Sequence, residues 1–133
     1  MIIKITPDRE KAASILNMVK NRKEFISSAN IERFPTIAVE NYYEIIKELA
    51  AAILLLDGIK ATGESVHKET IDALSEYRQI EEWEINLIDD LRLKRNKSSY
   101  EGKQINISYL ENKKDKIIQI IEKLENLLRR KLK

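Results

Sequence analysis

The chain lacks cysteine, has only three glycines and two prolines, and contains no long hydrophobic run. The absence of cysteine excludes disulfides, thiolate metal sites and cysteine nucleophiles. The longest apolar run, residues 49–56, is far shorter than the roughly 20 residues that a membrane-spanning helix needs. Residues 1–7 also lack the apolar region of a signal peptide. We therefore expect a cytoplasmic protein without a membrane partner.

Neither sign of charge is in large excess: the formal net charge is only +2, although 35% of the residues are charged. This balance excludes the global basic field of a protein that coats nucleic acid, so any such contact must be local. A chain of 133 residues fits one domain, residues 1–133, whose core is large enough to be stable without metal or disulfides.

Apolar residues recur at helical spacing through nearly the whole chain. The pattern predicts an all-α, up-and-down bundle of four to five helices. The expected helices are residues 7–28, 36–63, one starting at Ser65, one through residues 83–91, and one starting at Ser108. Whether the third and fourth helices are continuous is left open.

Local signals indicate where these helices begin and end. Thr6 before Pro7, Thr36, and the capping box formed by Ser108 with Glu111 are the expected N-terminal caps. The expected C-terminal ends are Gly63 and Gly102. The second helix is apolar on more than one face and should be the most enclosed element, with Tyr42 and Tyr43 in the core or a dimer interface.

The run 91–102 places polar residues on an otherwise apolar helical stripe. Ile88 and Leu91 define the buried stripe, and the next positions along it are Arg95 and Ser99. A guanidinium in line with core residues costs several kcal/mol unless it is paired or reaches a cleft. Arg95 is therefore either required inside the fold or opens onto a site.

Other donors surround Arg95 on the expected helix. Arg92, Arg95 and Ser99 share one side, and Asn96 and Tyr100 lie next to it. Guanidinium, amide and hydroxyl donors together suit a phosphate group. In the alternative interpretation Arg92 is solvated and Arg95 caps the bundle by pairing with a carboxylate of the second helix, such as Glu44 or Glu48.

Residues 95–100, Arg-Asn-Lys-Ser-Ser-Tyr, resemble the terminal motif of the HEPN superfamily (higher eukaryotes and prokaryotes nucleotide-binding). In that motif an arginine is followed by a polar residue, often asparagine, and a few residues later by histidine. Residues 43–60 and 63–68 are similar to the second and third helices of prokaryotic HEPN proteins. The resemblance spans about residues 38–102.

The resemblance implies a HEPN-like homodimer in which the motifs of two protomers meet in a cleft. In RNA-cleaving members the arginine stabilises charge on the phosphate and the histidine assists proton transfer from the 2′-hydroxyl, without a metal. Arg95 matches the arginine, Asn96 matches its polar neighbour, and Tyr100 stands at the histidine position. A phenol stays protonated at neutral pH and is a poor general base. Binding of phosphate, nucleotide or RNA is therefore expected to survive this change better than cleavage.

His67 is the only histidine of the chain. One interpretation makes it a substitute base that reaches Arg95 from the start of the third helix. The other makes it a polar residue of the first turn that helps to satisfy a helix end. A single histidine without a clustered carboxylate pair supplies too few ligands for a metal, so neither a metal site nor a cofactor is expected.

Three functions remain open from the sequence. The first is a nucleotide- or RNA-binding module, or the partner of a minimal nucleotidyltransferase in a toxin–antitoxin pair. The second is a metal-independent endoribonuclease that uses Arg95 with Tyr100 or His67. The third is a non-catalytic dimeric scaffold.

Overall fold

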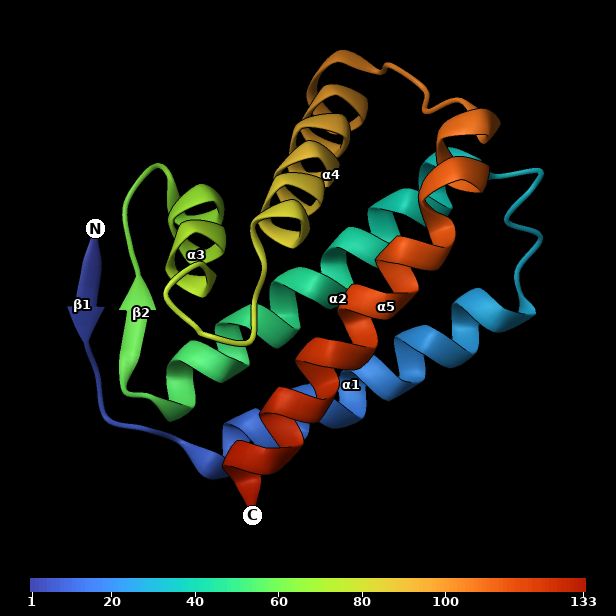
Figure 1. Ribbon diagram of the computed structural model, residues 1–133. Coiled ribbons are helices and arrows are strands. Elements are labelled where there is room, and N and C mark those ends of the chain that lie inside the picture. Colours follow the sequence, from blue (N-terminus) through green and yellow to red (C-terminus); the bar gives the residue numbers. More distant parts are fainter.

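A computed structural model describes residues 1–133 and shows five helices with a small two-stranded sheet (Figure 1). The elements are β1 (Ile2–Lys4), α1 (Arg9–Ser28), α2 (Pro35–Leu56), β2 (Ile59–Ala61), α3 (Val66–Leu74), α4 (Glu82–Glu101) and α5 (Ile107–Leu132). The predicted all-α helical bundle is confirmed, and the third and fourth helices are separate.

Helix α2 is the centre of the bundle because it packs against each of the other four helices (Figure 1). Eleven of its 22 residues are buried, and they lie on more than one face of the helix. Continuous apolar sequence between residues 49 and 56 produces this enclosure, since each successive side chain turns towards a different neighbour. None of the helices combines the length and the apolar composition that crossing a membrane requires.

The amino-terminal segment is a strand where the sequence predicts only the approach to a helix. Strand β1 pairs antiparallel with β2, with Ile2 opposite Ala61, and the Ile5 amide donates to the Gly58 carbonyl at 2.8 Å. Helix α1 consequently begins later than predicted. Asp8, not Thr6, is its N-cap, because the Asp8 carboxylate accepts a hydrogen bond from the Lys11 amide at 2.9 Å.

Helix α2 ends at Leu56, so the predicted end at Gly63 is wrong. Gly58 has a φ of +73°, and a Cβ atom there would lie 3.0 Å from the Ile5 carbonyl oxygen. This left-handed residue turns the chain out of the helix and into β2. Strand β2 pairs with β1 near the amino terminus. Local periodicity does not reveal a pairing between segments so far apart in the sequence.

Two predicted caps have other roles. Thr36 lies inside the first turn of α2, after Pro35, and its hydroxyl accepts a hydrogen bond from the Ile105 amide at 2.7 Å. Asn106, not Ser108, caps α5, because its side-chain oxygen accepts from the Ser108 amide at 3.0 Å. Gly102 ends α4 with a φ of +67°, as predicted.

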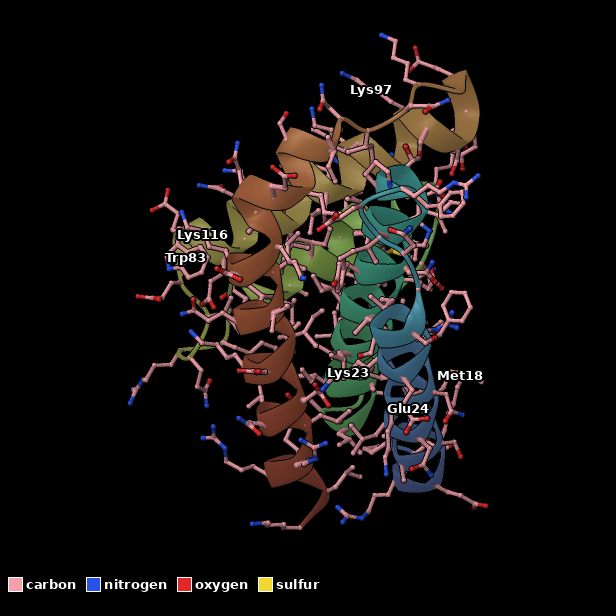
Figure 2. All side chains as sticks on the ribbon, turned by 90° about the vertical axis from the view of Figure 1, so that its right-hand side faces the viewer. Met18, Lys23, Glu24, Trp83, Lys97 and Lys116 are labelled. Atoms are coloured by element: carbon pink, nitrogen blue, oxygen red, sulfur yellow. The ribbon has the colours of Figure 1, made fainter.

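The edge between α4 and α5 carries the only tryptophan of the chain. Trp83 in the first turn of α4 and Lys116 of α5 lie side by side there (Figure 2) and line a cavity of about 280 Å³. The indole nitrogen donates a hydrogen bond to the Glu81 carboxylate at 3.0 Å. Trp83 is therefore anchored at the beginning of α4.

Candidate functional site

Helices α2 and α4 run in opposite directions and are held in register by polar contacts at one end (Figure 1). The Ser98 hydroxyl donates to the Glu40 carboxylate at 2.8 Å, one turn inward from the contact between Thr36 and residue 105. One turn beyond Glu40 along α2 lies Tyr43, and one turn before Ser98 along α4 lies Arg95. This register places Arg95 opposite Tyr43.

Arg95 is half-buried on the α4 stripe that Ile88 and Leu91 begin, and both of these residues are fully buried. Its side chain forms no ion pair and no hydrogen bond. The two carboxylates considered as partners are engaged elsewhere. Glu44 pairs with Lys47 at 3.0 Å and Glu48 with Arg22 at 2.9 Å, so the proposed pairing of Arg95 with either is wrong.

Arg92 has a partner on its own helix. Its Nε atom donates to the Asp89 carboxylate at 2.9 Å, and only 16% of its side chain is exposed. The interpretation of Arg92 as a solvated residue is therefore wrong. Ser99 is exposed, with its hydroxyl 3.5 Å from the Glu40 carboxylate, and Asn96 is half-buried.

Tyr100 lies away from Arg95. Five helical residues turn the side chain by about 140° relative to Arg95, and Tyr100 is 79% exposed. The structure therefore brings Arg92, Arg95 and Ser99 to one side of α4 but not Tyr100.

His67 lies in the first turn of α3, which packs against both α2 and α4. Partial desolvation lowers its pKa from 6.5, and the positive charges of Lys47, Arg95 and Arg92 lower it further, against an opposing effect of Glu44. The imidazole forms no hydrogen bond that would satisfy a helix end. His67 is exposed and forms no hydrogen bond or ion pair with Arg95, so its role as a substitute base stays a prediction.

Three residues of α2 belong to this region and were not identified from the sequence as site residues. Glu40, Tyr43 and Lys47 follow each other at spacings of three and four residues on the face towards α4. For Glu40 and Lys47 the available signal was their charge on a largely apolar helix, whereas Tyr43 has the spacing of a core residue. We call these residues, together with His67, Arg92 and Arg95, the α2–α3–α4 site.

Tyr43 is the most enclosed member of the α2–α3–α4 site. Burial raises the pKa of Tyr43 to about 12, although the charges of Arg92 and Arg95 act in the opposite direction. The phenol is therefore protonated throughout the physiological pH range. It is a hydrogen-bond donor and not a base.

The pairings around Arg95 define what the site can bind. The charge of Lys47 is offset by the Glu44 carboxylate and that of Arg92 by the Asp89 carboxylate, whereas the Arg95 guanidinium has no such partner. An unpaired guanidinium with nearby neutral donors is suited to an anion with several oxygen atoms. No protein-family model, no curated protein and no solved structure matches the chain, so the function is inferred from these residues.

The environment of His67 leads to a direct prediction. The imidazole pKa should lie below 6.5, and Arg95→Ala should raise it, because a positive charge that disfavours the imidazolium is removed. The folded chain binds this proton less readily than the unfolded chain, so His67 lowers the free energy of unfolding as pH falls below 6.5. The single imidazole can be titrated by heteronuclear NMR. A midpoint at or above 6.5 would contradict the prediction, and Arg130→Ala is the control that should leave it unchanged.

Proposed function

We propose that the protein is a HEPN-like module that binds a phosphate group of RNA or of a nucleotide at the α2–α3–α4 site. The observation that carries this proposal is the half-buried, unpaired Arg95 guanidinium on a stripe of core residues. A guanidinium so placed is costly for the fold alone, and a bidentate contact to phosphate would offset that cost.

The neighbouring charges support the same proposal. Lys47 and Arg92 keep carboxylate partners that offset their charges, so Arg95 is the one unpaired cation of the site. His67 has a lowered pKa and is mainly neutral at pH 7, so its ring can donate or accept one hydrogen bond. The site therefore offers one strong cationic contact and several neutral ones.

In the same proposal the module is a cytoplasmic, prokaryotic homodimer and the partner of a minimal nucleotidyltransferase in a toxin–antitoxin pair. This part rests mainly on the resemblance of residues 38–102 to HEPN proteins. Exposed apolar side chains at the α1–α2 end add support, because such patches are typical of protein contacts. They are Phe25, Phe34 and Ile37, and Met18 is a further exposed apolar residue, midway along the outer face of α1 (Figure 2).

The second candidate function is a metal-independent endoribonuclease that uses Arg95 with His67. What favours it is the lowered pKa of His67, which burial and the charges of Lys47 and Arg95 produce and which leaves the imidazole mainly unprotonated at neutral pH. A neutral imidazole can accept the 2′-hydroxyl proton, while the guanidinium stabilises charge on the phosphate. Tyr100 is too exposed and too far around α4 to serve as the base in this arrangement.

Binding and cleavage can be tested on one preparation. Labelled oligouridine and AMP are titrated into the purified protein in EDTA at several salt concentrations, and the RNA is then analysed for 2′,3′-cyclic phosphate ends. The proposal expects binding that weakens with salt, because the contact is electrostatic. Cleavage that His67→Gln abolishes would favour the enzyme. If neither probe bound, the proposed function would be overturned, and the non-catalytic dimeric scaffold would be the remaining interpretation.

A further inference from the structure

Tyr43 is the one tyrosine whose hydroxyl group is enclosed from solvent and also has no hydrogen-bond partner. The hydroxyls of Tyr77 and Tyr109 donate to carboxylates, those of Asp57 and Asp90. Tyr43 is only 2% exposed, and its hydroxyl has neither solvent contact nor a hydrogen-bond partner. Leaving a buried hydroxyl unpaired costs about 1–3 kcal/mol. A phenylalanine would fill the same space without this cost.

The position of the unpaired hydroxyl links it to Arg95. The contact of Glu40 with Ser98 fixes the register of α2 and α4, and one turn further inward the same register sets Tyr43 against Arg95. The charges of Arg92 and Arg95 both act on the phenol. An uncharged donor therefore lies on the part of α2 that packs against α4, the helix whose Arg95 guanidinium the proposed function assigns to phosphate.

We propose that Tyr43 is a specificity-determining residue of the α2–α3–α4 site, whose hydroxyl donates a hydrogen bond to a phosphate oxygen held by Arg95. This inference rests on the proposed function. Because the hydroxyl has no solvent contact in the free protein, the ligand reaches it only when a covering side chain moves aside. Arg95 has a long side chain that no ion pair or hydrogen bond holds, so it can make this movement.

The arrangement selects a particular class of ligand. A phosphate group offers separate oxygen atoms, so one can accept from the guanidinium while another accepts from the phenol. A monatomic anion such as chloride offers no second acceptor atom at a fixed distance. The site should therefore prefer phosphate monoesters and diesters to chloride of equal concentration.

The test is Tyr43→Phe, measured both for stability and for binding of the labelled oligouridine and AMP. The melting temperature should stay the same or rise, because the substitution removes only an unpaired hydroxyl. The dissociation constant should increase by about 10- to 100-fold, the effect of one hydrogen bond to an ionised group. Stability and affinity should thus change in opposite directions, which loss of a structural hydrogen bond would not produce.

Tyr109→Phe is the matched control, because its hydroxyl donates to Asp90 at 2.5 Å outside the α2–α3–α4 site. This control should lower the melting temperature and leave the dissociation constant unchanged. A double variant with Arg95→Ala should lose less than the sum of the two single effects, since both groups hold the same phosphate.

The outcomes separate this inference from the proposed function. If Arg95→Ala weakens binding and Tyr43→Phe does not, the role of Tyr43 is overturned and the phosphate site stands. If Tyr43→Phe lowers the melting temperature without altering affinity, an ordered water satisfies the hydroxyl and the inference is likewise overturned. If neither variant alters binding, the proposed function itself fails.

Discussion

Replacing Arg95 by alanine is expected to weaken binding of oligouridine or AMP by about 10- to 100-fold. Hydrogen bonds to charged groups contribute about 1.5–3 kcal/mol, and each 1.4 kcal/mol corresponds to a tenfold change in the dissociation constant. The melting temperature should stay the same or rise, because the substitution removes no ion pair or hydrogen bond and relieves the cost of a half-buried, unpaired guanidinium. Fluorescence anisotropy with a salt series measures the first effect, and thermal unfolding measures the second.

Two further variants sharpen this experiment. Arg130→Ala removes an exposed arginine near the end of α5, so it should alter affinity only slightly. Arg95→Lys keeps the charge but loses the two-pronged donor geometry, and it should restore only part of the affinity. Equal effects of Arg95→Ala and Arg130→Ala would show that binding follows overall charge and not this site.

Replacing Leu91 by alanine is expected to lower the free energy of unfolding by about 2–5 kcal/mol. Leu91 is fully buried in the core cluster, so truncation removes apolar burial and leaves a cavity. Urea denaturation followed by circular dichroism measures the change. Leu93→Ala, two residues further along α4, is the control: that leucine is 46% exposed and the variant should differ from the parent by less than about 0.5 kcal/mol.

The contrast between Leu91 and Arg95 has a physical meaning. Both lie on the same stripe of α4, one turn apart, yet one is expected to determine stability and the other binding. If Leu91→Ala and Leu93→Ala destabilised the protein equally, the orientation of α4 against α2 would differ from the one that the structure shows. The position of Arg95 opposite Tyr43 would then be wrong as well.

Helical periodicity was sufficient to predict the fold class and the enclosed position of α2. It works because the apolar spacing of an amphipathic helix follows directly from which side chains face the core. It failed for β1 and β2, since strands of three residues are too short for a pattern and pair across more than fifty residues of sequence. Local capping signals failed where a competing residue, such as Asp8 or Asn106, lay within two residues.

The candidate site was only partly predictable for a related reason. Arg95 was identifiable because a charged residue on an apolar stripe breaks a pattern along one helix. The approach of His67 depends on how α3 packs against α2 and α4, which spacing within α3 does not encode. The spacing of Tyr43 is that of a core residue. Only its enclosed hydroxyl without an acceptor distinguishes it from the rest of the core.

The position of Trp83 has a practical consequence for all of these measurements. The indole lies twelve residues before Arg95 on α4, about 18 Å along the helix axis, and faces Lys116 of α5 (Figure 2). Its fluorescence should therefore report loss of the contact between α4 and α5, while the imidazole resonances of His67 report occupancy of the α2–α3–α4 site. One protein sample thus carries two independent probes, an indole followed by fluorescence and an imidazole followed by NMR. Unfolding can therefore be distinguished from ligand binding in the same sample.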